Sequence, residues 1–289
     1  MKNILTLVSI LAIFISSCKK KETDPVSQNT SKEVLSDYSK NICLNTYQEL
    51  SIQTAKLYDD ISTLNSSTTD NNLELCRSDW KAAREVWENS EAWLFGPVAT
   101  ENIDPRIDTW PVDFIRLDSV LNTTTVFNSA YINSLEESLK GFHPIEYLLF
   151  GQNGNKKASE LTDKQKEYLL ALAQNLKELT ADLYNSWDEK QGNYVSELVN
   201  AGASNEFPTQ QSAYLEIVGA MSGICDEVAN GKIGEVLTNL DSMGEESPFA
   251  KNSITDFLKT TSLASRMSIT PVLDRLMEKG LKTLFASTT

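Results

Sequence analysis

The sequence predicts an all-α protein that is built as two packed helical bundles. Apolar residues recur every three or four positions along several segments, which places them on one face of an α-helix. We find no convincing run in which apolar and polar residues alternate, as they do in a half-buried β-strand. The chain of 289 residues is long enough for one large core or two modest ones.

Residues 1–17 are predicted to be a lipoprotein signal peptide. Lys2 gives a positive start, and Ile4–Ile15 is an uncharged apolar run that is shorter than the roughly 20 residues of a membrane-spanning helix. The run ends in the letters ISSC, a lipobox pattern in which cleavage leaves Cys18 as the lipidated N-terminal residue. The alternative is an ordinary signal peptide that happens to precede a cysteine.

Residues 18–32 are expected to form a flexible tether, because they are polar and contain a proline but no periodic apolar pattern.

Lysines follow Cys18 where inner-membrane lipoproteins carry an aspartate, so the outer membrane is favoured as the location of the lipid anchor. The sequence does not decide between the periplasmic and external faces. No second hydrophobic stretch suggests a spanning helix.

Four segments that carry the helical pattern follow the tether. They are residues 33–61, 73–94, 161–183 and 214–228. A polar linker at residues 62–72 separates the first two. A last helix is expected to begin with Thr270 as its N-cap and Pro271 at its first position, since proline has no N–H to donate and its φ suits that position.

Two regions between these segments are less regular, residues 96–122 and 249–267. A stretch rich in Gly, Asn and Lys at residues 151–157 is the best candidate boundary between the two bundles. We therefore predict an N-terminal bundle over residues 33–153 and a C-terminal bundle over residues 154–289.

Charge and cysteine content exclude some classes of protein. The formal net charge of −14 argues against a nucleic-acid-binding protein, because phosphates require Lys and Arg. Cys43, Cys76 and Cys225 lack the close paired spacing of a zinc or redox motif. A disulfide between Cys43 and Cys76 and a pair of buried free thiols both remain open.

The chain contains a single histidine, His143. A metallopeptidase of the HExxH type needs two histidines one helical turn apart, and a three-histidine zinc site needs three, so the sequence excludes both. Glu146 follows at i+3, where the two side chains share a helical face and could bind one iron, zinc or manganese ion. Alternatively, His143 is the N-cap of a helix whose first residue is Pro144. The carboxylate of Glu146 would then cap the first turn and interact favourably with the positive end of the helix dipole. On spacing alone we prefer the capping interpretation.

Two further groups of polar residues are candidates. Arg84 precedes Glu88 by one helical turn, a spacing that usually makes a surface ion pair of little energy. Glu91 lies beside the apolar stripe of the same helix, so we expect it to be partly buried. Asp113 is one of several carboxylates around Trp110 in irregular chain, where they either face a cleft or form a solvated loop.

Four blocks of sequence resemble the imelysin family. Residues 141–151, GFHPIEYLLFG, match its GxHxxE signature. The helix with Trp80, Arg84, Trp87 and Glu91, the letters DTWPVD at 108–113, and the Glu-Ser, Asn-Ser and Asp block that ends near Asp256 resemble its other blocks, in the same order. The similarity covers residues 35–285.

The resemblance implies an envelope protein of two helical bundles with the GxHxxE region near their interface. It makes His143 and Glu146 the leading metal ligands, with Glu91 and Asp113 available to complete the set. It also makes four residues candidates for a ligand or interface role: Arg84, Trp110, Ser253 and Asp256. It reverses the preference for capping at His143.

The family is catalogued as metallopeptidases, and related helical domains occur in periplasmic components of iron-uptake systems. The single histidine makes catalysis uncertain. We therefore expect a non-enzymatic protein, anchored through Cys18, that binds a divalent metal such as iron or zinc and works with an envelope partner in iron acquisition. A metal-dependent peptidase and a protein-interaction module are the alternatives.

Overall fold

The computed structural model describes residues 25–123, 125–240 and 244–269, and these ranges contain helices but no strand. The predicted all-α class is therefore confirmed. The signal peptide, Cys18 and the predicted helix start at Thr270 lie outside the described residues.

The described chain begins with three helical elements that follow one another without a break. They are α1 (Pro25–Asp37), the π-helix η1 (Tyr38–Leu44) and α2 (Asn45–Ser66). Helix therefore begins within the stretch expected to be a tether. The Tyr214 hydroxyl of α11 (Gln210–Asp226) donates a hydrogen bond to the carbonyl of Ser31 at 2.7 Å. This contact helps to explain why the helix extends so far toward the N-terminus.

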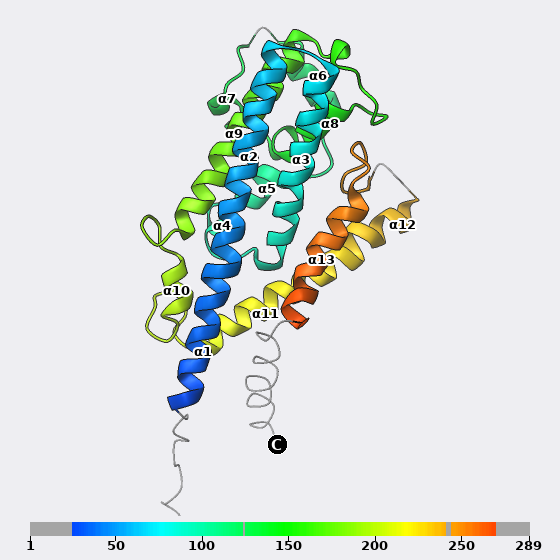
Figure 1. Ribbon diagram of the computed structural model, residues 1–289. Helices are drawn as coiled ribbons and strands as arrows, with labels where there is room; N and C mark the ends of the chain where they lie inside the picture. The colour runs from blue at the N-terminus through cyan, green and yellow to red at the C-terminus, as the bar shows by residue number, and fades with distance from the viewer. Residues whose placement is uncertain (1–24, 124, 241–243, 270–289) are drawn as a thin grey trace, which may run out of the picture.

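Helices α2, α3 (Asp70–Ser90) and α9 (Asp163–Trp187) form the main body of the molecule, with α2 packed against both of the others (Figure 1). Thr69 caps α3 by accepting a hydrogen bond from the backbone N–H of Asn72. A reciprocal capping box of Thr162 and Gln165 starts α9. The predicted stripe of α3 is buried. Its members are Leu73, Cys76, Trp80, Ala83 and Trp87.

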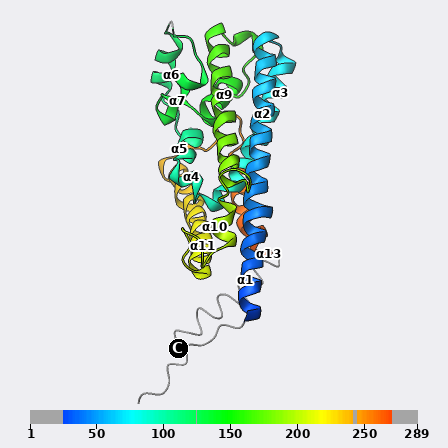
Figure 2. The same cartoon turned by 90° about the vertical axis from the view of Figure 1, so that its left-hand side faces the viewer.

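Short elements fill the region between α3 and α9. They are η2 (Glu91–Trp93), α4 (Pro97–Thr100), α5 (Ile103–Asp108), α6 (Phe114–Leu121), α7 (Ser129–Asn133), η3 (Glu137–Leu139), α8 (Phe142–Phe150) and η4 (Ala158–Glu160). Helix α8 packs against α3 and α9, and α6 and α7 lie beside α9 (Figure 2). The predicted irregular region at 96–122 thus contains three short helices.

The rest of the described chain contains α10 (Val195–Val199), α11, the π-helix η5 (Glu227–Glu235), α12 (Val236–Asn239) and α13 (Ser253–Ile269). Together α11, η5 and α12 make one nearly continuous rod beside α13, and α13 packs against α3 (Figure 1). Helix α9 packs with α2 and α8, although it follows the predicted boundary at residue 153. The division into residues 33–153 and 154–289 stays a prediction.

Cys43 and Cys76 are buried free thiols and Cys225 is an exposed one. None of the described helices is both long and apolar enough to cross a membrane.

Two leucines of α3 provide a matched test of the packing. Leu73 is buried and Leu75 is 51% exposed. We expect Leu73→Ala to lower the free energy of unfolding by about 2–5 kcal/mol, because it leaves a cavity in the core. Leu75→Ala is expected to change it by less than about 0.5 kcal/mol. Urea unfolding of both variants measures the difference, and equal losses would contradict the packing of α3.

Candidate metal centre

The candidate site lies where α3, α5, α8 and the segment before α13 meet. A glycine permits the closest of these approaches. Gly141, directly before α8, has φ +83°, and a Cβ placed on it would lie 2.2 Å from the carbonyl oxygen of Ile107. Only glycine tolerates both conditions. The first residue of the GxHxxE motif thus brings Asp108, the last residue of α5, beside His143.

His143 is buried between two carboxylates. Its Nε2 lies 3.0 Å from Oδ1 of Asp108, and its Nδ1 lies 3.5 Å from Oε2 of Glu146. The other oxygen of Glu146 accepts a hydrogen bond from the backbone N–H of Ala250 at 2.7 Å, which ties α8 to the segment before α13. The ring of Trp110 packs against the imidazole, with 5.0 Å between ring centroids.

The guanidinium of Arg84 is fully buried and binds three carboxylates. Its Nη2 lies 2.5 Å from Oε1 of Glu88 and 2.6 Å from Oε1 of Glu246, and its Nη1 binds Asp108. Asp108 also accepts a hydrogen bond from Nε1 of Trp87 at 2.6 Å. Asp108 therefore joins Arg84 to His143.

A second cation, Lys232 of η5, approaches the same cluster with its side chain only 7% exposed. Its Nζ lies 2.8 Å from Oε2 of Glu91, 3.4 Å from Oε1 of Glu246 and 3.5 Å from Oε2 of Glu88. Thr260 of α13 donates a hydrogen bond to Glu88. These contacts connect the rod of α11, η5 and α12 with α3 and α13.

Asp256 and Ser253 hold the start of α13 in place. Asp256 accepts hydrogen bonds from the Ser247 hydroxyl at 2.6 Å and from Nδ2 of Asn252 at 2.7 Å. The Ser253 hydroxyl accepts a hydrogen bond from the backbone N–H of Ser247 at 3.0 Å. Both residues therefore position the segment that carries Glu246.

The surroundings change the protonation of these groups. Burial lowers the pKa of His143, but the carboxylates of Asp108 and Glu146 beside the imidazole outweigh burial and raise the pKa to about 9. Burial opposes ionisation of Asp108, but Arg84 and His143 hold its pKa well below the usual range. Burial raises the pKa of Asp256 to about 7 and also raises that of Glu246.

Carboxyl groups outnumber cations in this cluster. Among the described residues, six buried or nearly buried carboxyl groups, Glu88, Glu91, Asp108, Glu146, Glu246 and Asp256, surround three cationic side chains, Arg84, His143 and Lys232. Protons or a bound cation must balance the excess, because unpaired charge is costly in a buried site.

Two sets of three residues bring ligand-type atoms within 4.8 Å of one another: Asp108, His143 and Glu246, and Glu88, Glu91 and Asp108. Oε2 of Glu146, also beside His143, has no hydrogen-bond partner within the described part of the chain. An imidazole nitrogen with carboxylate oxygens suits iron, zinc or manganese. The donor set therefore fits a transition-metal cation.

The structure brings together most of the predicted site residues, but not all. His143, Glu146 and Trp110 lie together, and Arg84, Glu91 and Asp256 belong to the adjoining charged network. Asp113 lies apart, since it caps α6 by accepting a hydrogen bond from the backbone N–H of Arg116 at 3.0 Å.

The capping interpretation of His143 is wrong. Gly141 is the N-cap of α8, and no side-chain hydrogen bond from the described residues caps the N-terminus of this helix. Glu146 accepts its backbone hydrogen bond from Ala250 and not from its own helix. The interpretation failed because the chain reverses tightly at Gly141, so helical conformation starts one residue before His143.

Sequence reasoning missed the importance of four residues, Glu88, Asp108, Lys232 and Glu246. The sequence predicts Glu88 only as part of a surface ion pair, and Asp108 is only one of the several carboxylates around Trp110. Glu246 lies in a block that resembles the family pattern. Lys232 carried no sequence signal, because it is an isolated lysine outside every motif.

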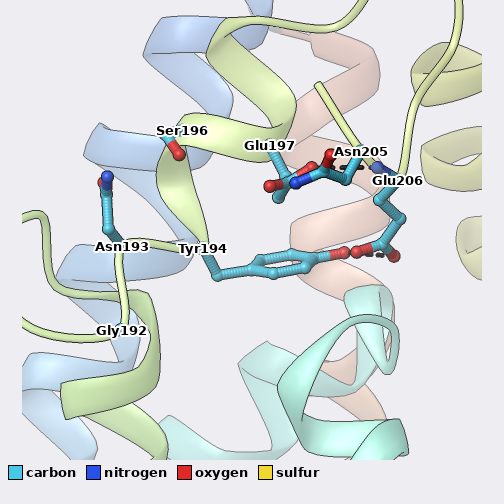
Figure 3. A pocket seen from close by; sticks show the side chains of 7 residues that line it. All are labelled: Gly192, Asn193, Tyr194, Ser196, Glu197, Asn205 and Glu206. Atoms are coloured by element: carbon cyan, nitrogen blue, oxygen red, sulfur yellow. Dashed lines mark hydrogen bonds between the residues drawn. The ribbon is translucent and has the colours of Figure 1, made fainter.

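An open hollow of about 430 Å³ lies elsewhere, around Tyr194, Glu197, Asn205 and Glu206 (Figure 3). The Tyr194 hydroxyl donates a hydrogen bond to Glu206 at 2.6 Å there. No residue of the charged cluster lines this hollow. It therefore does not give access to His143.

The fold and the site define an all-helical protein with a buried cluster of histidine, arginine, lysine and carboxylates. Residues 43–266 match the family described as imelysin, and the chain belongs to this family. It is 30% identical over 227 residues to "Iron-regulated protein A" of Synechococcus elongatus, covering 78% of this chain and 60% of that protein. The chain thus spans less than two thirds of the length of this relative.

Two solved structures have a similar fold. One is a candidate iron-regulated protein A precursor from Parabacteroides distasonis, with a TM-score of 0.73, 23% identity, and coverage of 84% of this chain and 74% of that one. The other is an imelysin-like protein from Psychrobacter arcticum, with a TM-score of 0.69, 15% identity, and coverage of 86% and 77%. These likenesses concern the fold.

The close approach at Gly141 can be tested with a second glycine as control. We expect Gly141→Ala to lower the free energy of unfolding by about 2–5 kcal/mol, because the new Cβ meets the Ile107 backbone at a strained φ. Gly219 of α11 has open space around it. Gly219→Ala is expected to stabilise by up to about 1 kcal/mol. Chemical unfolding measures both, and a neutral Gly141→Ala would contradict the packing of α5 on α8.

The single histidine allows a direct pH measurement on protein without a histidine tag. The folded pKa of about 9 exceeds the ordinary value of about 6.5, so protonated His143 stabilises the fold below pH 6.5 and this stabilisation is lost as pH rises through 9. We expect the free energy of unfolding to fall by about 3 kcal/mol over that interval, and less in His143→Gln. NMR titration of the ring protons gives the pKa, and a midpoint near 6.5 would refute the double carboxylate contact.

Proposed function

We propose that this protein is a non-enzymatic, lipid-anchored protein of the cell envelope that binds a metal cation in an iron-related process. The observation that carries the proposal is the convergence of Asp108, His143 and Glu246, whose ligand-type atoms lie within 4.8 Å of one another. Glu146 is the fourth candidate ligand, because Oε2 of its carboxylate faces the imidazole without a hydrogen-bond partner among the described residues.

The charge of the cluster supports a cation as the ligand. Six carboxyl groups surround three cationic side chains, so an added cation would reduce the electrostatic imbalance. Networks of buried ions contribute little net stability compared with well-packed apolar residues. We therefore attribute the presence of this network, in place of apolar packing, to binding.

The donor chemistry favours a transition metal such as iron, zinc or manganese. In the resting protein the pKa of about 9 keeps His143 protonated at neutral pH. Binding through this imidazole requires loss of that proton, so metal uptake is expected to release protons to solvent. Asp108 would stay ionised throughout, because the charge of Arg84 holds its pKa low.

Burial of the site supports binding over peptide cleavage. The side chain of His143 is fully buried and packs against Trp110, so the described part of the chain exposes no surface of the imidazole to a peptide bond. The chain has no second histidine to complete a catalytic zinc site. A metal-dependent peptidase is the alternative that the test below examines.

The iron-related role rests on the names of relatives, "Iron-regulated protein A" in Synechococcus elongatus and a candidate precursor of that name in Parabacteroides distasonis. The location rests on the lipobox at Cys18. We propose attachment to the outer membrane by lipid, and an envelope partner of an iron-acquisition system.

Titration of tag-free protein with Fe²⁺, Zn²⁺ and Mn²⁺ tests this function. We expect binding of one of them at a ratio near one per chain, weakened at least about tenfold by His143→Ala and by Glu246→Gln. Asp113→Asn is the matched control, because Asp113 caps α6 away from the cluster. Calorimetry in two buffers of different ionisation enthalpy also measures the released protons.

Other results would select another function. Cleavage of peptides that requires both metal and His143 would select the peptidase. If the wild type binds none of the three metals and both variants are destabilised, the cluster is a polar network that joins structural elements, and a protein-interaction module is the better interpretation.

A further inference from the structure

The π-helix η5 is attached to the body of the protein through few side chains. Most of its residues are exposed, and Val228 is its one buried apolar residue. Lys232 is its main polar attachment, since the ammonium reaches the charged cluster while the glycines at 231 and 234 give it no packing side chains. Single π-helical turns are uncommon and often occur at functional sites.

The ammonium of Lys232 occupies the centre of a carboxylate set. It lies 2.8 and 3.1 Å from the two oxygens of Glu91, and 3.4 to 3.5 Å from oxygens of Glu246 and Glu88. Glu246 belongs to the set of ligand-type atoms around His143, and Glu88 and Glu91 to the adjoining set. A cation bound by these oxygens would therefore require the position that Lys232 holds.

We propose that Lys232 is a tethered competitor of the bound cation, and that binding of a multivalent cation displaces Lys232 and releases η5. The inference rests on the proposed function and specifies the class of ligand. It makes Lys232 the residue that determines which cations the site accepts.

Charge explains the expected selectivity. The ammonium carries one positive charge and three N–H donors, and it is already covalently attached beside the carboxylates. A monovalent ion such as K⁺ brings no more charge and must also lose water, so it does not displace Lys232. A divalent or trivalent cation interacts more strongly with the same oxygens and compensates more of the excess negative charge.

Release of η5 would expose a bond that the present structure protects. Trypsin cuts after lysine, and the Lys232 side chain is buried whereas Lys190, in the turn after α9, is exposed. The rate of cleavage after Lys232 relative to cleavage after Lys190 therefore reports displacement. Mass spectrometry of brief digests, with Mn²⁺ or with KCl of equal ionic strength, gives this ratio.

We expect saturating Mn²⁺ to raise the ratio at least about tenfold and KCl to leave it unchanged. We also expect Lys232→Met, which keeps the length of the side chain but removes the charge, to bind Mn²⁺ at least about tenfold more tightly than the wild type. Lys190→Met is the matched control and is expected to bind like the wild type. If Lys232→Met does not fold, the digest of wild-type protein alone still tests whether Mn²⁺ displaces Lys232.

The outcomes separate the inference from the proposed function. Mn²⁺ binding by the wild type with an unchanged or lower ratio at Lys232 would overturn the inference and leave the binding function in place. Binding by Lys232→Met but not by the wild type would support the competitor role and contradict the binding function of the resting protein. No binding by either protein would overturn both.

Discussion

The buried guanidinium of Arg84 is the interaction on which the rest of the site depends. A charged side chain with no exposed surface needs partners in fixed positions, because an unpaired buried charge costs several kcal/mol. Its partners Glu88, Asp108 and Glu246 come from α3, from the end of α5 and from the segment before α13. The need to pair one cation therefore fixes three parts of the chain that are far apart in sequence.

Asp108 links Arg84 to the candidate metal centre, because it contacts both Arg84 and His143. Oδ1 of Asp108 binds Arg84 and also lies 3.0 Å from Nε2 of His143. Gly141 permits the close backbone approach that makes this second contact possible. His143 is thereby held charged, and Lys232 supplies a third positive charge from η5. Arg84, His143 and Lys232 thus balance part of the negative charge of the cluster, and protons or an added cation must balance the excess of carboxyl groups that remains among the described residues.

Much of the fold could be predicted from the sequence, because helical periodicity depends on local spacing, as the buried stripe of α3 illustrates. His143 and Glu146 could also be found, since both lie in one short motif. The sequence could not show that Asp108, and not the predicted ligand Asp113, lies beside His143. Several carboxylates share that irregular region, and only the close approach of Gly141 to Ile107 brings Asp108 to the site. Lys232 was beyond prediction, since its position depends on how η5 packs on α3.

The most direct test measures the free energy of unfolding of Arg84→Met, of Asp108→Asn and of the double variant. We expect Arg84→Met to lower the free energy of unfolding by about 3–5 kcal/mol, because three carboxylates lose their buried partner. Adding Asp108→Asn is expected to restore part of the loss, since it removes one uncompensated charge. A loss below about 1 kcal/mol for Arg84→Met, or a double variant whose loss is the sum of the two single losses, would contradict the central role of Arg84.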